Sequence, residues 1–287
     1  MKLALATSTT LAVATLAIPQ AHSDKDAQMQ LSKRIVGGNV APANKYPFSS
    51  IIKTIYSEGL SKCGGTIISK NHVVTAAHCV VRTATGEHAL PQNIYAGYGN
   101  NTYIYQTLIP ARRVFVHPQY NSTGLKNDIA ILELPDLPLD GVTVATVPVY
   151  KGWLFPEMAT TAIGWGMTNT TDSHSPSYLL KEATVKIGNT APCRNHINKY
   201  LHDTFVSSNG PRICIERSLT LGNGVCTGDS GSPLLVFVRG KPYFAGVDSN
   251  GGSAQGTFSC GDAGGFDFFT NVRNYLHFIY TVTGCWF

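Results

Sequence analysis

Several features that would place this 287-residue chain in other protein classes are missing. The sequence has no internal repeat, no low-complexity block and no phosphate-binding glycine loop. Beyond the N-terminal stretch, no apolar segment approaches the roughly 20 residues that a membrane-spanning helix needs. The net charge is only +5, and the basic residues are scattered rather than clustered. These absences argue against repeat architectures, phosphate loops, membrane spans and nucleic-acid partners.

Helical periodicity is also scarce. Apolar residues recur at a 3.6-residue spacing only near the C-terminus, over residues 271–280, and this predicts a terminal helix. Elsewhere short runs rich in β-branched and aromatic residues alternate with Gly, Pro, Asn and Ser clusters; examples are residues 50–56, 66–68, 129–134, 183–187 and 234–238. The fold class is therefore predicted to be all-β, and no metal or cofactor site is expected.

The N-terminus has the pattern of a secretory signal. A positive charge at Lys2 precedes an apolar stretch over residues 3–18, and the small residues Ala21 and Ser23 follow at the positions that a signal peptidase reads. We expect a signal peptide over residues 1–23 and a soluble, secreted, extracellular product, with a signal anchor as the alternative. In an oxidising compartment the seven cysteines indicate disulfides, and three sequons suggest glycosylation, at Asn100, Asn121 and Asn169.

The segment Cys226-Thr-Gly-Asp-Ser-Gly-Ser holds a candidate nucleophile, Ser230. A serine hydroxyl must lose its proton as it attacks a carbonyl, and a neutral histidine can accept that proton near neutral pH. His78, in Thr-Ala-Ala-His-Cys, is the candidate base, and Asp128, at the start of a buried strand, would hold its tautomer and stabilise the imidazolium. The backbone N–H groups of Gly228 and Ser230 would bind the oxyanion.

Each motif is weak alone, since a serine between glycines is usually a turn and a histidine beside a cysteine is usually structural or a metal ligand. In the order Ala-Ala-His-Cys, Asp-Ile-Ala and Gly-Asp-Ser-Gly, however, they resemble the chymotrypsin/trypsin family of serine endopeptidases. The resemblance covers residues 35–282 and includes the segments Ile-Val-Gly-Gly (35–38), Cys-Gly-Gly (63–65), His-Pro-Gln-Tyr-Asn (117–121), Gly-Trp-Gly (164–166) and Phe-Thr-Asn-Val (269–272).

The resemblance implies two packed six-stranded antiparallel β-barrels with a C-terminal helix, the catalytic groups lying between them. Residues 35–287 would form this protease domain, with the barrel boundary near 135–155. It also implies three disulfides: Cys63 with Cys79, Cys193 with Cys214, and Cys226 with Cys260. Cys285 is left without a partner.

The polar segment 24–34 is similar to an activation propeptide. In the family, cleavage before Ile-Val-Gly-Gly frees an ammonium that pairs with the aspartate preceding the nucleophile. Here that implies cleavage after Arg34 and a pair between the Ile35 amine and Asp229, whose buried carboxylate would otherwise lack a counter-charge.

Primary specificity departs from the trypsin pattern. Gly224 stands where trypsin has an aspartate at the pocket base, whereas Asp267 stands at a pocket-wall position where trypsin has glycine. The family's collagenase-like members from crustaceans share this exchange, so we expect a pocket that takes basic and large apolar side chains, with Asp248 as a rival acid. Ser249 and Gly251 would bind the substrate backbone.

Two other positions depart from the family pattern. Asn250 replaces a usual tryptophan, and Ser232 replaces a usual glycine. The expected partners are protein or peptide substrates and protein inhibitors. The protein itself is expected to be a monomer. The competing hypotheses are a catalytically silent binding protein on a protease scaffold and a hydrolase of esters alone.

Overall fold

The computed structural model describes residues 38–167, 177–201, 203–253, 255–256 and 260–285. The chain divides into two compact units, Met1–Ser32 and Lys33–Phe287, and all described residues belong to the second. The predicted signal peptide and propeptide, with Arg34, Ile35 and Asn169, therefore lie outside the described residues. Within the described residues, no helix is long and apolar enough to cross a membrane.

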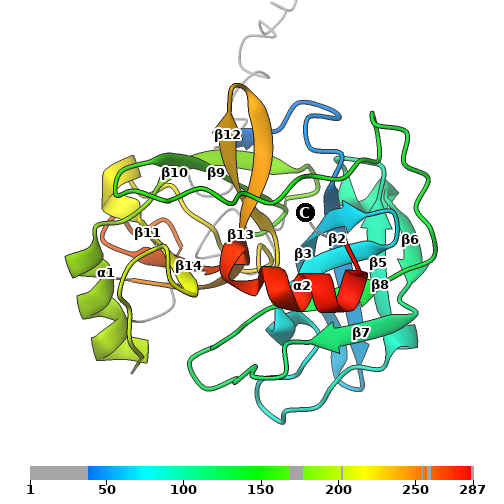
Figure 1. The fold of residues 1–287 in the computed structure, drawn as a ribbon, viewed down its shortest axis with the longest axis horizontal. Coiled ribbons are helices and arrows are strands. Elements are labelled where there is room, and N and C mark those ends of the chain that lie inside the picture. The colour runs from blue at the N-terminus through cyan, green and yellow to red at the C-terminus, as the bar shows by residue number, and fades with distance from the viewer. Residues whose placement is uncertain (1–37, 168–176, 202, 254, 257–259, 286–287) are drawn as a thin grey trace, which may run out of the picture. The chain divides into compact units, whose positions relative to one another are not determined.

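The first sheet is antiparallel and has the strand order β6-β5-β2-β3-β4-β8-β7 (Figure 1). Its strands are β2 (Ser49–Tyr56), β3 (Gly59–Ser69), β4 (His72–Thr75), β5 (Ile94–Tyr98), β6 (Thr107–Pro110), β7 (Arg113–Val116) and β8 (Ala130–Glu133). The edge strands β6 and β7 are separated in the chain only by Ala111 and Arg112. Because two residues span so little distance, the two edges must come together, and the sheet curls into a barrel.

The second sheet is also antiparallel, with the order β1-β10-β9-β12-β13-β14-β11. Its strands are β1 (Asn39–Val40), β9 (Ala159–Gly164), β10 (Lys181–Lys186), β11 (Arg212–Glu216), β12 (Pro233–Val238), β13 (Lys241–Gly252) and β14 (Phe266–Asn271). An isolated bridge between Ile187, just after β10, and Ile215 of β11 links strands near opposite edges. This sheet therefore also curls toward closure.

The all-β prediction is confirmed, although each sheet has seven strands where six were expected. The first sheet gains one because the chain between Thr107 and Val116 is interrupted into two edge strands, and the second because the two-residue β1 pairs with β10. The predicted terminal helix is present as a 3₁₀ turn, η6 (Val272–Tyr275), followed by α2 (Leu276–Thr283).

Some short elements were not predicted. The helix α1 (Thr190–His196) has only seven residues, too few to display a helical period, and continues into a π-helical turn, η4 (Ile197–Leu201). The other short elements are 3₁₀ turns: η1 (Ala77–Cys79), η2 (Pro91–Asn93), η3 (Tyr103–Tyr105) and η5 (Arg217–Thr220).

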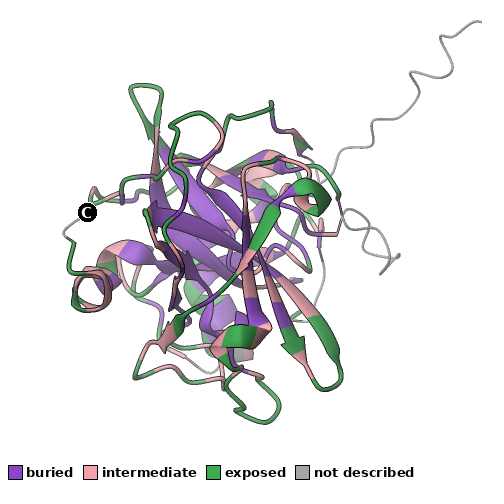
Figure 2. Ribbon diagram, turned by 90° about the vertical axis from the view of Figure 1, so that its right-hand side faces the viewer, coloured by how far each residue is buried: buried purple, intermediate pink, exposed green. Residues whose placement is uncertain are grey.

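The two sheets share a buried apolar core. Ile51 and Ile131 of the first sheet belong to the same buried cluster as Leu235 and Phe244 of the second, and Ile279 of α2 completes it. Figure 2 shows buried strand segments inside and exposed hairpin tips outside. Burial of each large aliphatic side chain contributes roughly 1.5–3 kcal/mol. This core fixes the loops of both sheets that carry the candidate catalytic residues.

Candidate active site

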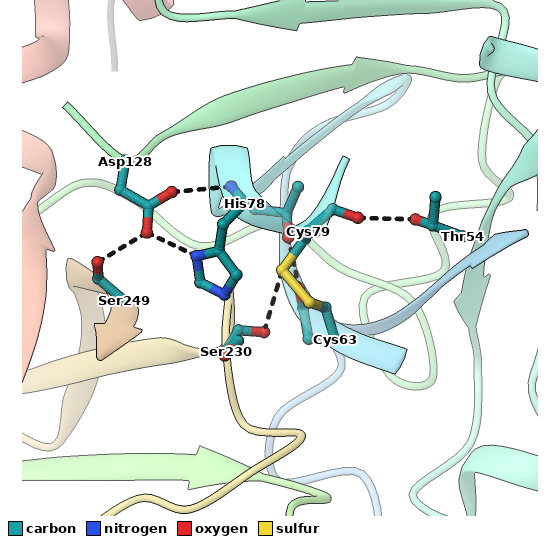
Figure 3. The surroundings of a disulfide bond; sticks show 9 residues. Thr54, Cys63, His78, Cys79, Asp128, Ser230 and Ser249 are labelled. Atoms are coloured by element: carbon teal, nitrogen blue, oxygen red, sulfur yellow. Dashed lines mark hydrogen bonds and ion pairs between the residues drawn. A yellow bond between two sulfur atoms is a disulfide. The ribbon is translucent and has the colours of Figure 1, made fainter. Parts of the chain in front are cut away.

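His78 and Asp128 are held together by two hydrogen bonds. His78 lies in the turn η1 after β4, and Asp128 lies two residues before β8, the neighbour of β4. His78 Nδ1 is 2.7 Å from Asp128 Oδ2, and the backbone N–H of His78 donates to Oδ1 at 2.9 Å (Figure 3). Since the Asp128 carboxylate binds both the ring and the backbone N–H of His78, the imidazole has a fixed orientation.

Asp128 is completely buried, and the second sheet also contributes to its surroundings. The hydroxyl of Ser249, on β13, donates to Asp128 Oδ2 at 2.7 Å, and Thr270 Oγ1 donates to the Asp128 backbone carbonyl at 2.8 Å. Burial lowers the pKa of His78, but the charge and hydrogen bond of Asp128 outweigh it, so the net pKa is raised above its usual value. The site thus stabilises a protonated imidazole.

Ser230 lies on the opposite side of the imidazole from Asp128 (Figure 3). Its carbonyl accepts a hydrogen bond from Gly64 N at 2.7 Å, which ties the serine loop to β3 of the first sheet. Within the described residues, no hydrogen bond joins the Ser230 hydroxyl to the ring. The structure therefore brings the three predicted catalytic residues together, with the serine and the aspartate on opposite sides of the imidazole ring.

The backbone N–H groups of Gly228 and Ser230 have no acceptor among the described residues. Gly228 has a φ of 92°, a left-handed conformation that favours glycine. Two unpaired donors beside a serine hydroxyl could bind an oxyanion.

Three disulfides brace the site and the second sheet: Cys63–Cys79, Cys193–Cys214 and Cys226–Cys260. These are the pairs that the resemblance implied, and Cys285 is exposed and unbonded. In the described part of the chain, one group of potential metal ligands is close enough to hold an ion, formed by Cys63, His78 and Cys79. Its two sulfur atoms are bonded to each other, so neither offers a thiolate.

Asp229 is fully buried, and backbone amides bind its carboxylate. Gly166 N donates to Oδ1 at 2.7 Å and Cys226 N donates to Oδ2 at 2.9 Å. Burial raises the pKa of this carboxyl to about 6, although the two amides and the nearby Lys62 lower it. No salt bridge joins Asp229 to a cation among the residues that the structure describes.

A cavity of about 230 Å³ opens beside Ser230. Its lining residues are Arg217, Val225, Cys226, Thr227, Ser230, Asp248, Ser249, Asn250 and Gly251. Of the predicted substrate-binding residues, Ser249 and Gly251 therefore line it, whereas Gly224 and Asp267 do not. Asp248, the rival acid, does line it, and its Oδ1 is buried without a hydrogen-bond partner among the residues that the structure describes.

Asp267 has a partner that sequence reasoning missed. Arg217 Nε lies 3.1 Å from both carboxylate oxygens, its Nη2 contacts Oδ1, and both side chains are only 1% exposed. Val225 N adds a hydrogen bond to Oδ2 at 3.3 Å. The sequence signal was slight, because Arg217 follows a buried strand, where a charged residue usually marks the return to solvent.

Comparisons of the sequence with known proteins identify its family. Residues 35–279 match the family described as Trypsin. Brachyurin from Leptuca pugilator is 31% identical over 255 residues, which covers 87% of this chain and 99% of that protein. Chymotrypsin-like elastase family member 1 from Felis catus is 32% identical over 287 residues, covering 95% and 97%. Trypsin from Saccharopolyspora erythraea is 29% identical over 202 residues, covering 70% and 82%. The chain therefore belongs to the trypsin family, the trypsin- and chymotrypsin-like serine protease hydrolases.

Proposed function

We propose that this protein is a serine endopeptidase in which Ser230 is the nucleophile, His78 the general base and Asp128 the group that orients and stabilises the imidazole. The observation that carries this proposal is the hydrogen-bonded arrangement of Asp128 and His78 beside Ser230. The two unpaired amides of Gly228 and Ser230 supply the oxyanion hole.

The reaction follows from these positions. Ser230 Oγ attacks the carbonyl carbon of the scissile peptide while its proton moves to His78 Nε2, and Asp128 stabilises the imidazolium that forms. The carbonyl oxygen becomes an oxyanion that accepts hydrogen bonds from the two amides. His78 then protonates the leaving amine. Water, deprotonated by the same imidazole, attacks the acyl-enzyme carbonyl, and the imidazolium returns that proton to Ser230 Oγ as the acid product leaves.

Substrates are extended peptide segments of proteins. Ser249 and Gly251 lie in β13 and line the cavity beside Ser230, so the substrate backbone can pair with this strand. The sequence predicted basic and large apolar side chains for the primary pocket. The pairing of Asp267 with Arg217 favours the uncharged class over the basic one.

The enzyme is made as a secreted precursor. Residues 1–23 are the signal peptide and 24–34 the propeptide, and residues 35–287 form the protease domain, with the barrel boundary near 135–155. After cleavage behind Arg34, the Ile35 ammonium pairs with Asp229. This buried carboxylate forms no salt bridge with any described residue. The mature enzyme is a monomer open to protein inhibitors, and the exposed Asn100 and Asn121 are its candidate glycosylation sites.

Digestion of an unbiased peptide mixture by the chain cleaved after Arg34, read by mass spectrometry, tests the proposal. Cuts that disappear with Ser230→Ala support the endopeptidase, and equal digestion by both proteins would refute it. In parallel, uncleaved Arg34→Gln protein should stay inactive, and full activity of that variant would refute the precursor mechanism.

A further inference from the structure

A buried ion pair lies at the wall of the cavity beside Ser230. Arg217 lines this cavity and binds the carboxylate of Asp267 through both Nε and Nη2. Asp267 is not among the residues that line the cavity, and its carboxylate also accepts a hydrogen bond from the backbone of Val225, which does line it. Of the two members of the pair, Arg217 is therefore the one that an incoming side chain would meet.

Three glycines make room for this ion pair. A Cβ at Gly251 would lie 2.6 Å from Asp267 Oδ1 and 2.8 Å from Arg217 Nη2. One at Gly265 would lie 2.6 Å from the Gly252 carbonyl oxygen and 2.7 Å from Arg217 Nη1. A Cβ at Gly224, the position predicted for the pocket base, would overlap Asp267 and lie 2.8 Å from Arg217 Nε. All these contacts are closer than a side chain tolerates. Arg217 and Asp267 together thus occupy the space beside the predicted base of the pocket.

We propose that Arg217 takes the place of a substrate's basic side chain at the deep end of the primary pocket, so that this pocket selects uncharged side chains and excludes Arg and Lys. The inference rests on the proposed function and deepens it, since it assigns a substrate class to the same site. Neither Arg217 nor its role was expected from the sequence.

The charges around the cavity support this selection. Arg217 neutralises Asp267, and an incoming ammonium or guanidinium would meet a like charge. The other acid, Asp248, is 3% exposed, and its Oδ1 has no hydrogen-bond partner in the described part of the chain. Burial, and then the neighbouring carboxylates Asp229, Asp267 and Asp128, raise the pKa of Asp248 well above its usual range. Arg217 lowers this pKa, but the net shift still disfavours the ionised carboxylate and so weakens the attraction of Asp248 for a cation.

The test uses peptides that differ only in the residue before the scissile bond, which is Leu, Tyr, Lys or Arg, and compares their kcat/KM. The wild-type chain cleaved after Arg34 should prefer Leu or Tyr over Lys and Arg by about tenfold or more. Arg217→Ala should uncover Asp267 and raise kcat/KM for the Lys and Arg peptides by about tenfold or more, which reduces or inverts the preference.

A matched control separates charge from space. The double variant Arg217→Ala with Asp267→Asn opens the same volume without the acid, so it should show no such gain for Lys or Arg. If Arg217→Ala does not fold, the wild-type preference decides. Equal or better cleavage after Lys and Arg by the wild type would overturn the inference, as would an Arg217→Ala variant that folds but gains no such cleavage.

Failure of the inference is distinguishable from failure of the proposed function. Cleavage after Lys and Arg that equals or exceeds cleavage after Leu and Tyr, and that disappears in Ser230→Ala, overturns only the role of Arg217. Absence of any Ser230-dependent cleavage across all four peptides overturns both.

Discussion

Asp128 and Asp267 are both buried carboxylates, but they bind partners of different chemistry. Asp128 binds His78, an imidazole that gains and loses a proton near neutral pH. Asp267 binds Arg217, a guanidinium that stays charged. Both side chains have an exposure of 1% or less. In the proposed mechanism, the partner's ability to change charge, rather than burial, determines whether a buried acid supports proton transfer or remains in a static pair.

The largest expected effect comes from removing the charge of Asp128. Asp128→Asn keeps the size of the side chain but favours the wrong tautomer of His78 and no longer stabilises the imidazolium. We expect kcat to fall by about 10⁴-fold, as in the Ser-His-Asp template. Steady-state kinetics on a peptide cleaved by the wild type checks this, and a loss below about tenfold would refute the role of Asp128.

The corresponding change at the other acid should act on stability. Arg217→Ala leaves the Asp267 carboxylate buried without its partner, so the free energy of unfolding should fall by about 3–5 kcal/mol. Urea denaturation of the inactive Ser230→Ala background measures it. The control, Arg217→Met with Asp267→Leu, removes both charges and should cost much less. Equal stabilities of wild type and Arg217→Ala would contradict the buried pair.

Ser249 should have a smaller effect on catalysis. Ser249→Ala removes one donor to Asp128 Oδ2 while the two His78 contacts remain. We expect kcat to fall by roughly 10- to 100-fold, the range of one hydrogen bond to a charged group. Thr270→Val removes a donor to the Asp128 backbone carbonyl instead, and it should cost less. A larger loss from Thr270→Val would contradict the importance of the carboxylate contact.

The smallest effect is a shift in pH dependence. His78 must be neutral to accept the Ser230 proton, so kcat/KM should fall as pH decreases through its raised pKa. The midpoint of this acid limb should lie above the usual histidine value of about 6.5. Ser249→Ala keeps the charge of Asp128 and should retain a raised midpoint, whereas residual activity of Asp128→Asn should have a lower one. A wild-type midpoint below 6 would contradict the effect of Asp128.

The contrast between the two acids also explains what could be predicted from sequence. His78, Asp128 and Ser230 lie in short motifs whose order identifies the family, and the strand runs have a local periodicity. The strand count was missed because the interruption between β6 and β7 depends on pairing at opposite sheet edges. Arg217 was missed because its partner is 50 residues away, and no local pattern brings the end of β11 beside β14.

The most direct measurement of the central claim is covalent labelling of Ser230 by a fluorophosphonate, read by the intact mass of the chain cleaved after Arg34. A hydroxyl activated by His78 and Asp128 should take up one adduct per chain on Ser230, and His78→Ala should abolish the reaction. Absence of labelling in the properly cleaved wild type would contradict the account and favour a catalytically silent binding protein.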